Sequence, residues 1–471
     1  MARRKKRFPQ LLEQVTFTSM ADKGRCVGRD PEGRVVFAEG AAPGDVADVR
    51  IFKKRKGVLW GNPTVFHQRS ADRVEPFCDH FGVCGGCKWQ HVDYTAQLRH
   101  KEQGVRDAIA RIGKVDVEEW QPILGGAETT YYRNKLEFGL ANRRWLTEEE
   151  VKDESISQLM PVAGFHRAGA YDKLIQIDHC YLQADPSNGI RNGLRELAIE
   201  MDMPFFDMRE RTGMIRQLMI RTSSLGQAMV LIAFYENKQD LIQPFMEAVQ
   251  ARFPSITSLY YCINNKVNEY LMDLEMVHFS GLADMEEALG EVHYRLGPKS
   301  FFQTNTQQAT RLFDIAVEFA DLQGTENVYD LYTGIGSIAL YLAKHCQQVV
   351  GIEEIAAAID DAKANAARNG ITNTRFYAGD VKDILTTEFA QEHGTPDLLI
   401  TDPPRAGMHP KVVDMLLQLA APRMVYISCN PATQARDLAL LAEAYRVVKM
   451  RAVDMFPHTA HVESVALLVR R

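Results

Sequence analysis

From Val328 to the C-terminus, short apolar segments alternate with segments of helical periodicity. Such alternation predicts a mostly parallel sheet with helices on both faces, which is an α/β fold. The last two apolar segments follow one another without a helix and are expected to close the sheet as a hairpin. The predicted strands are "NVYDLY", "QQVVGIEE", "TRFYAG", "PDLLITD", "RMVYISC", "RVVKMRAVDMF" and "SVALLVRR".

The first strand-to-helix turn of this region, "DLYTGIGSIALYLA", has the composition of a ligand-binding turn. Gly334 and Gly336 let the backbone pass close to a ligand, and Asp330 and Ser337 can bond to it at the helix N-terminus. A lone G-x-G sequence is about equally often a ligand-binding turn and a tight turn that binds nothing. The neighbouring strands therefore decide between the two interpretations.

Acidic residues end the next three strands. Glu353 lies 17 residues after Gly336, near the roughly 20 expected of an acid that binds ribose hydroxyls. Asp380 and Asp402 end the third and fourth strands, at the edge where an open α/β sheet binds its ligand. A nucleoside cofactor explains these acids better than a solvated surface. The turn lacks the third glycine of a pyrophosphate fingerprint and the region has no phosphate-binding G-x-x-x-x-G-K-[ST], which disfavours NAD and ATP and favours S-adenosylmethionine.

The fourth strand runs into Asp402-Pro403-Pro404, a rigid loop that can hold a carboxylate and backbone carbonyls toward a flat base. Methyltransferases that act on exocyclic amines have an aromatic residue after the prolines, whereas here Arg405 follows. An arginine can bond a pyrimidine carbonyl and stabilise negative charge that develops on it.

The fifth strand ends at Cys429, and Asn430-Pro431 then turns the chain sharply. Carbon 5 of uracil is a poor nucleophile, so its methylation requires a nucleophile to add temporarily at carbon 6. A thiolate suits this step because it adds readily and leaves again. A buried structural cysteine is the alternative, and the neighbouring acids favour the nucleophile.

The same mechanism needs a base that removes the proton from carbon 5. The segment "FPHTAHVESVALL" offers His458, His461 and Glu463. We predict Glu463, because a carboxylate at the start of an apolar strand is partly desolvated and its pKa is raised. A solvated strand-edge carboxylate is the alternative.

Three of the eight cysteines crowd into "CDHFGVCGGC", with the spacing C-x5-C-x2-C at Cys78, Cys84 and Cys87. So few cysteines in a long chain fit a reducing compartment, where clustered thiols indicate metal. From the residues alone, three cysteines fit zinc as well as iron and sulfur, and His80 or His91 would complete a zinc site.

The chain before the α/β region contains further predicted elements. Residues 8–66 form short β segments with a basic run at Lys53-Lys54-Arg55-Lys56, as in a small oligonucleotide-binding barrel. Residues 93–113 have helical periodicity, and residues 131–298 are mostly β with two helices. We therefore expect three domains: residues 1–68 with the barrel, residues 69–290 as an α+β central domain with the cysteine cluster, and residues 291–471 as the catalytic domain. The helix near 93–113 is expected to pack on the catalytic domain.

A net charge of -6 excludes a uniformly basic nucleic-acid coat, so RNA contacts must use local patches. One such patch is "MARRKKRF", which either binds phosphates or is a solvated tail. It is not followed by the apolar segment of a signal peptide, and no run of 18 apolar residues could span a membrane. We expect a cytoplasmic protein that needs no membrane and no obligate protein partner.

The last third of the chain resembles the RNA (uracil-5-)-methyltransferases, and the whole chain resembles their ribosomal branch. The motifs that carry the resemblance are "FFQTN", "DLYTGIGS", "DPPRAG", "YISCNPAT" and "FPHTAHVES", in the order of that family. The resemblance implies an S-adenosylmethionine-dependent enzyme with a Rossmann-like methyltransferase domain that makes 5-methyluridine in 23S ribosomal RNA. The cofactor site that it implies comprises Gln303, Tyr332, Gly334, Gly336, Ser337, Glu353, Asp380 and Asp402.

The resemblance also implies roles for other residues. Cys429 matches the nucleophile and Glu463 the base, while Phe301 and Arg405 match positions that contact the target uracil, and Asn305 belongs to the same motif as Phe301. Cys180, in "IDHCYLQ", matches the fourth ligand of a [4Fe-4S] cluster with Cys78, Cys84 and Cys87. The cluster is expected to be structural or to position RNA.

Residues 8–66 resemble the TRAM domain, a small RNA-binding barrel. The transfer RNA branch of the family generally lacks both this barrel and the cluster, which favours ribosomal RNA as the substrate. Transfer RNA or another folded RNA is the first alternative. A non-catalytic RNA-binding assembly factor is the second, and the presence of both Cys429 and Glu463 disfavours it.

Overall fold

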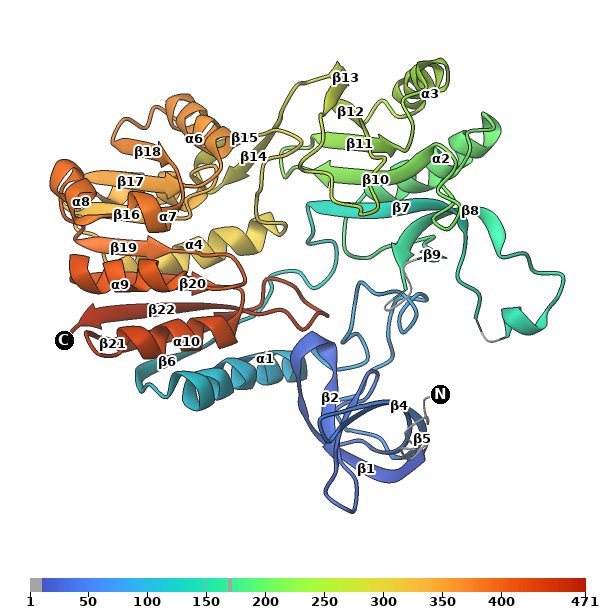
Figure 1. Ribbon diagram of the computed structural model, residues 1–471, viewed down its shortest axis with the longest axis horizontal. Coiled ribbons are helices and arrows are strands. Elements are labelled where there is room, and N and C mark those ends of the chain that lie inside the picture. The colour runs from blue at the N-terminus through green and yellow to red at the C-terminus, as the bar shows by residue number, and fades with distance from the viewer. Residues whose placement is uncertain (1–10, 148, 168–171) are drawn as a thin grey trace, which may run out of the picture.

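The computed structural model describes residues 11–147, 149–167 and 172–471, and the basic patch at residues 1–7 lies outside this part of the chain. Figure 1 shows a barrel, a central sheet with two helices, and a larger sheet with helices on both faces. None of the helices in the described ranges is both long and apolar enough to cross a membrane.

The N-terminal strands close into a five-stranded barrel in the order β1-β2-β3-β5-β4. Alternating buried and exposed residues fill its interior, as period-2 strands require. The hairpin between β4 and β5 turns at Lys56 and Gly57, both in the left-handed region, which suits the twist of the strands. The strands are β1 (Leu11–Met20), β2 (Cys26–Arg29), β3 (Val35–Ala38), β4 (Val46–Arg55) and β5 (Val58–Gln68), with the 3-10 helix η1 (Asp22–Gly24) between the first two.

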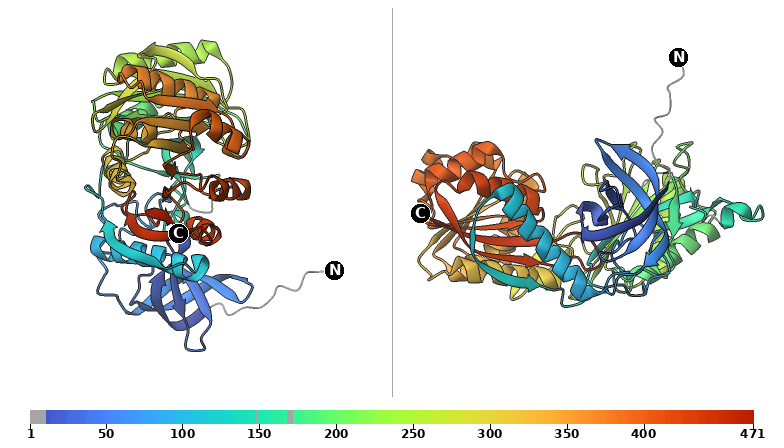
Figure 2. Two further views of the ribbon diagram at one scale, coloured as in Figure 1. Left: turned by 90° about the vertical axis from the view of Figure 1, so that its left-hand side faces the viewer. Right: turned by 90° about the horizontal axis from the view of Figure 1, so that it is seen from below.

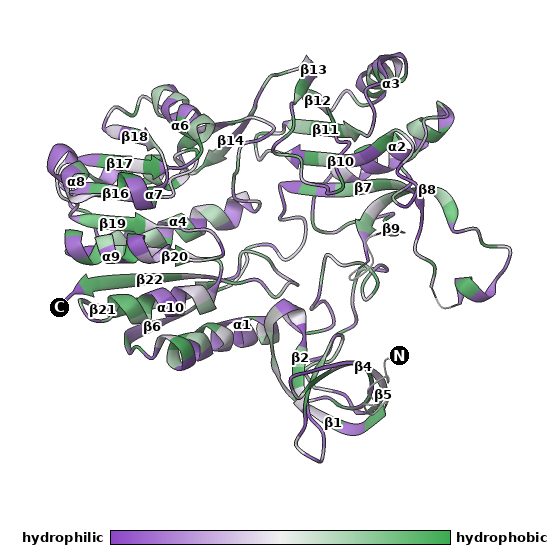
Figure 3. Ribbon diagram, in the orientation of Figure 1, coloured by the Kyte–Doolittle hydropathy of each residue, from purple (hydrophilic) through white to green (hydrophobic). Residues whose placement is uncertain are grey.

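The C-terminal sheet has eight strands in the order β18-β17-β16-β19-β20-β22-β21-β6. Strands β16 to β20 pair in parallel and β21 and β22 form the closing antiparallel hairpin, so the predicted α/β fold is confirmed. Figure 3 shows that β19 and β22 are hydrophobic along most of their length, as strands covered on both faces must be. The strands of this sheet are β16 (Asn327–Leu331), β17 (Gln348–Glu353), β18 (Thr374–Ala378), β19 (Leu398–Thr401), β20 (Arg423–Ser428), β21 (Tyr445–Val453), β22 (Glu463–Arg470) and β6 (Val117–Leu124).

Two hydrophobic cores flank this sheet. Helices α4 (Thr306–Ala320), α5 (Ser337–Leu342) and α6 (Ala356–Arg368) cover one face, and α9 (Pro410–Leu419) and α10 (Pro431–Leu441) cover the other. Three shorter helices, η4 (Ala343–His345), α7 (Val381–Ile384) and α8 (Thr387–His393), complete this region.

Strand β6 belongs to the catalytic sheet and helix α1 (Tyr94–Ala108) packs beside it, although both precede the central domain in sequence. The predicted helix is present, begins at the N-cap Asp93, and continues as the helical segment η2 (Ile109–Gly113), which packs against α10. Figure 2 shows this helix running alongside the catalytic sheet toward the barrel. Strand β6, parallel to β21, lies within the range 69–290 that the sequence assigned to the central domain.

The central domain is built on a seven-stranded sheet in the order β13-β12-β11-β10-β7-β8-β9. Its two middle strands, β10 and β11, are buried along nearly their whole length, and α2 and α3 pack on it. A separate hairpin of β14 and β15 packs between this domain and the catalytic domain. The elements are β7 (Lys135–Arg143), η3 (Glu150–Lys152), β8 (Leu159–His166), β9 (Leu174–Gln176), α2 (Ser187–Glu200), β10 (Ile215–Thr222), β11 (Ala228–Phe234), α3 (Gln239–Arg252), β12 (Ser258–Ile263), β13 (Val277–Gly281), β14 (Met285–Leu289) and β15 (Val292–Leu296).

Candidate active site

The turn from β16 into α5 has an unusual backbone. Tyr332, Gly334 and Gly336 all have positive φ, at 67°, 57° and 81°, a region that glycine occupies at little cost. A Cβ atom placed on Gly334 would meet nothing within 4 Å, so the space in front of this backbone is open to a ligand. Tyr332 is half-buried, and burial together with nearby carboxylates raises the pKa of its hydroxyl to about 12. Ser337 begins α5 at the same edge.

The three predicted carboxylates lie at the carboxyl ends of β17, β18 and β19, on either side of β16, which leads into this turn. Glu353 accepts hydrogen bonds from the N–H groups of Gly334, at 3.1 Å, and Ile355, at 3.0 Å. Asp380 caps α7 and pairs with Lys382, which holds the pKa of its carboxyl below the usual value. Asp402 is half-buried after β19, and burial with the charge of Asp330 raises its pKa to about 7. The structure therefore brings these acids together around the open turn.

The central domain holds the loop that carries Phe301 and Gln303. The Asn134 side-chain amide donates to the Gln303 carbonyl at 2.9 Å, and the Arg221 guanidinium donates to the Ser300 carbonyl at 2.9 Å. Phe301 is 73% exposed, so its ring is available to RNA. Sequence reasoning missed Asn134 and Arg221, whose partners lie more than 70 residues away in the chain.

Asn305 has a structural place beside this loop. Its side chain caps α4 by accepting from the Gln308 N–H at 3.1 Å, and its amide donates to the Met455 carbonyl at 2.9 Å. It thereby ties the start of α4 to the segment that leads into β22.

Cys429 follows β20 directly, and local capping explains its position. Asn430 is the N-cap of α10 and accepts from the Ala432 N–H at 3.1 Å, while Pro431 occupies the first helical turn, where a missing N–H costs nothing. The thiol is thereby presented at the sheet edge. Burial and the charges of Glu463 and Asp402 raise the pKa of Cys429 to about 11, and Arg405 opposes this shift.

Glu463 lies opposite Cys429, at the start of the neighbouring strand β22. Ser428 of β20 pairs with Ser464 of β22, so the next position in the antiparallel register sets Cys429 opposite Glu463. The Glu463 side chain is buried, and burial together with the charge of Asp402 raises its pKa to about 8. A carboxyl group with this pKa can exchange a proton near neutral pH.

Arg405 joins the two loops that carry these residues. Its carbonyl accepts from the Asn430 side-chain amide at 3.0 Å and from the Thr433 hydroxyl at 3.3 Å. Its guanidinium lies 3.2 Å from Nδ1 of His461. The arginine is otherwise exposed, with a cationic group beside both the thiol and the carboxyl.

His458, considered as a base from the sequence, has a structural position instead. It is buried, its ring nitrogen Nδ1 lies 3.1 Å from the Gln97 amide, and burial lowers its pKa to about 4. Its carbonyl accepts from the N–H groups of Lys88 and Trp89, at 2.8 and 3.0 Å. His458 thus connects the cysteine-rich loop to the segment that precedes Glu463.

A buried ion pair fixes the same segment to α1. Lys101 Nζ lies 2.6 Å from Asp454 Oδ1, and both side chains are fully buried. The Tyr94 hydroxyl donates to the other Asp454 oxygen at 3.0 Å, and Lys101 also donates to the Phe456 carbonyl at 3.1 Å. Helix α1 therefore positions the chain that leads to Glu463.

Comparisons with known proteins agree with this geometry. The family model described as tRNA (uracil-5-)-methyltransferase matches residues 284–471, and that of the TRAM domain matches residues 13–64. Two proteins named as uncharacterized RNA methyltransferases are close relatives: one from Bacteroides thetaiotaomicron, 48% identical over 96% of this chain and 100% of its own, and one from Porphyromonas gingivalis, 50% identical over 97% and 99%.

The chain belongs to the RNA (uracil-5-)-methyltransferase family. A solved structure supports this at full length: the Pyrococcus abyssi tRNA (uracil-54, C5)-methyltransferase in complex with S-adenosyl-L-homocysteine matches with a TM-score of 0.75 and 26% identity. The match covers 97% of this chain and 100% of that one. The chain is therefore an S-adenosylmethionine-dependent RNA methyltransferase that makes 5-methyluridine, with a TRAM barrel at its N-terminal end.

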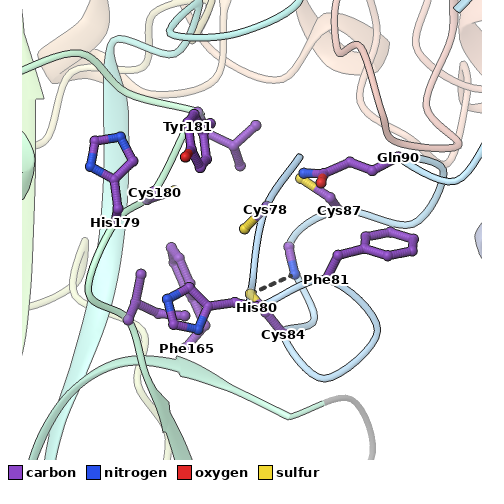
Figure 4. A pocket seen from close by; sticks show the side chains of 13 residues that line it. Cys78, His80, Phe81, Cys84, Cys87, Gln90, Phe165, His179, Cys180 and Tyr181 are labelled. Carbon is purple, nitrogen blue, oxygen red and sulfur yellow. Dashed lines mark hydrogen bonds between the residues drawn. The ribbon is translucent and has the colours of Figure 1, made fainter. Parts of the chain in front are cut away.

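The four cysteines of the predicted cluster line one pocket. Figure 4 shows Cys78, Cys84 and Cys87, which come from one loop, facing Cys180 from the segment after β9. All four are free thiols, and burial, followed by smaller effects that include neighbouring thiolates, raises the pKa of Cys84 to about 11 and of Cys87 to about 12. These thiols are therefore protonated at neutral pH, and a metal ion would have to displace their protons to bind.

The two histidines considered for a zinc site lie differently. His80 lines the pocket, but its Nε2 accepts from the Asp178 N–H at 3.1 Å. His91 is buried away from the pocket, with Nε2 3.1 Å from the Ala41 carbonyl of the barrel segment. In the described part of the chain, no group of three or more Cys, His, Asp or Glu side chains is arranged to hold a metal ion. Both the presence and the identity of a metal centre here stay predictions.

Proposed function

We propose that this cytoplasmic enzyme methylates carbon 5 of a uridine in 23S ribosomal RNA through a covalent adduct between Cys429 and carbon 6 of the base. The observation that carries the mechanism is the register of β20 and β22, which sets the thiol opposite a buried carboxyl group. The target base must leave its stack to reach this edge.

The residues divide the reaction between them. The Cys429 thiol loses its proton to solvent, and the thiolate adds to carbon 6, which makes carbon 5 electron-rich. Arg405 stabilises the negative charge that develops on the pyrimidine carbonyl. S-adenosylmethionine, when bound at the edge formed by Gly334 and Glu353, supplies the methyl group.

Glu463 completes the cycle. Its carboxylate takes the proton from carbon 5 of the methylated adduct, and the electron pair of that bond expels the Cys429 thiolate. A base whose pKa is near 8 is strong enough for this proton and still partly ionised at neutral pH. The product is 5-methyluridine and the thiol is regenerated.

The resemblance to the ribosomal branch supports ribosomal RNA, but the barrel does not discriminate, because the match to an enzyme named for transfer RNA covers 97% of this chain. Transfer RNA is the second candidate, since the Pyrococcus abyssi enzyme named for transfer RNA matches this chain over its full length. To decide, purified enzyme and methyl-labelled S-adenosylmethionine are incubated with separated 23S, 16S and transfer RNA that lack 5-methyluridine. We expect label only in 23S RNA, and label in transfer RNA instead would establish the second candidate.

The pocket of Cys78, Cys84, Cys87 and Cys180 is proposed to hold a [4Fe-4S] cluster. This proposal rests on the resemblance to the ribosomal branch, and all four cysteines line the same pocket, as the ligands of one cluster must. Iron, sulfide and zinc analysis of protein purified without oxygen tests this, and zinc without iron would contradict it.

A further inference from the structure

We propose that a basic pocket of the central domain binds a second nucleotide of the RNA substrate, separate from the target uridine, an inference that rests on the proposed RNA methylation. The pocket has a volume of about 910 Å³, within the range of small-molecule sites. Its cationic lining residues are Lys88, Arg167, Arg211, Arg216 and Lys266, and we call this site the basic pocket.

The charges of the basic pocket favour an anion. Five cationic side chains line it with one carboxylate, Glu269, whose oxygen already lies 2.9 Å from Nε2 of His166. Lys266 is paired with Asp273 and Lys88 lies 3.9 Å from Glu39, which leaves the arginines as the main source of positive charge. The basic pocket is thus locally cationic, although the whole chain has a net charge of -6.

Arg216 is a buried cation whose nearby carboxylate, Glu269, is shared with His166. The residue is 3% exposed, and its guanidinium donates to the carbonyls of Asn264, at 2.7 Å, Lys266, at 2.8 Å, and Asn268, at 3.0 Å. Its Nε has no hydrogen-bond partner among the described residues. The carbonyl groups orient this guanidinium and Glu269 offsets part of its charge, so a phosphate in the pocket would lower the remaining electrostatic cost.

The walls of the basic pocket suit a base as well as a phosphate. Phe165 is half-buried at the wall and can contact a base, whereas Phe206 is buried and supports Arg216 with a ring-to-guanidinium distance of 4.7 Å. Arg167 lies 4.1 Å over the Trp145 ring, which fixes the plane of its guanidinium. Aromatic rings and stacked arginines are the surfaces on which single-stranded RNA bases rest. A nucleotide satisfies both features, whereas a free inorganic anion satisfies only one.

The basic pocket is close to the catalytic machinery along the chain. Gly86 and Lys88 form part of its wall, and the Lys88 N–H donates to the His458 carbonyl at 2.8 Å. His458 precedes Glu463 by five residues. The loop that forms this wall of the basic pocket is therefore tied to the segment that leads to Glu463, and we propose that the nucleotide in the basic pocket is a neighbour of the target uridine in the same RNA strand.

The test uses Arg211→Gln and Arg167→Gln in the full-length protein. Arg211 is exposed at the rim, so its loss should leave folding intact. Arg252→Gln is the matched control, because Arg252 lies on α3 of the same domain, pairs with Glu200 and does not line the pocket. We expect each pocket variant to weaken binding of the methylated RNA about fivefold to tenfold, with a salt dependence reduced by about one charge and kcat at saturating RNA unchanged. The control should stay within about twofold.

Cross-linking gives a second measurement that needs no variant. RNA containing 4-thiouridine next to the target uridine should cross-link to peptides that contain residues 206–211 or 264–269. Unchanged RNA affinity in both pocket variants, or cross-links that avoid these peptides, would overturn the proposal. Tight binding of free uridine monophosphate at micromolar concentration would identify a small-molecule site instead and would also overturn it. If the label enters transfer RNA, the choice of 23S RNA fails, yet the same pocket variants then test the second nucleotide on that RNA.

Discussion

Cys429 and the cysteines of the pocket are the same residue type held in two different ways. Cys429 stands alone at a strand end, opposite a buried carboxyl group and beside a guanidinium. The other four come from two distant segments and face a shared space with apolar walls. Burial raises the pKa of both kinds of thiol. The difference lies in the partners: an acid–base pair suits a transient bond to carbon, whereas a ring of thiols suits a permanent bond to metal.

Removal of the thiol at the sheet edge should have the largest effect. Cys429→Ala should lower methyl transfer by at least about 10⁴-fold, since no adduct can form, while cofactor binding survives. Turnover with labelled S-adenosylmethionine and calorimetric binding of S-adenosylhomocysteine measure the two properties. Cys346→Ala, which changes a buried cysteine beside η4, serves as the control and should keep its turnover. Normal methylation by Cys429→Ala would remove the distinction between the two kinds of cysteine.

The carboxyl group opposite Cys429 should act later in the reaction. Glu463→Gln should lower turnover by about 10²-fold to 10⁴-fold and let the protein–RNA adduct accumulate, because the proton on carbon 5 is no longer removed. Denaturing gels of the reaction with unmodified RNA would show the adduct. If this variant released product as fast as the parent enzyme, another residue would have to be the base.

The pH dependence of stability provides a third measure. The pKa of Glu463 is raised to about 8 in the folded protein, so folding favours its protonated form. Its stabilising contribution is complete below the unfolded pKa near 4.5 and is lost as the pH rises through 8. Glu463→Gln should therefore be more stable than the parent at pH 9 by about 5 kcal/mol, and close to it at pH 5. Denaturant unfolding at both pH values measures this, and an equal difference at both would contradict the raised pKa.

A change in the pocket should have the smallest effect on catalysis. Cys84→Ser should remove most bound iron but lower turnover only about tenfold, through the loop that contacts His458, because the reacting groups remain. Adduct formation with 5-fluorouridine RNA should persist. Cys262→Ala, in β12, is the control and should keep its iron. If Cys84→Ser abolished the adduct at saturating RNA, the pocket would belong to the chemistry rather than to the scaffold.

The sequence was informative where chemistry follows local pattern. Strand ends converge in a parallel sheet, so Glu353, Asp380 and Asp402 could be placed together without coordinates. Asn430 and Pro431 similarly predict the start of a helix directly after Cys429. The α/β fold was predictable for the same reason, because its strands are short, apolar and separated by helices.

Other features depend on partners far apart in the chain and escaped prediction. Strand β6 contains Pro122 and lacks regular alternation, as a strand at a sheet edge often does. Arg221 shows its role only when its carbonyl partner near Phe301 is known. His458 looked like a candidate base, yet its contacts with Gln97 and Lys88 come from a segment more than 350 residues earlier. Periodicity gives no information about such contacts.

The early position of β6 and α1 has a practical consequence for anyone who dissects the enzyme. A fragment that begins near residue 291 would lack β6, so the outer edge of β21 would be unpaired. It would also lack Lys101, so the buried carboxylate of Asp454 would lose its ion-pair partner. An unpaired edge strand promotes aggregation with other copies of the chain, and a buried carboxylate without a partner destabilises the folded state. The methyltransferase unit is thus discontinuous in the gene, and a minimal version must retain residues 93–124 joined to the rest by a replacement linker.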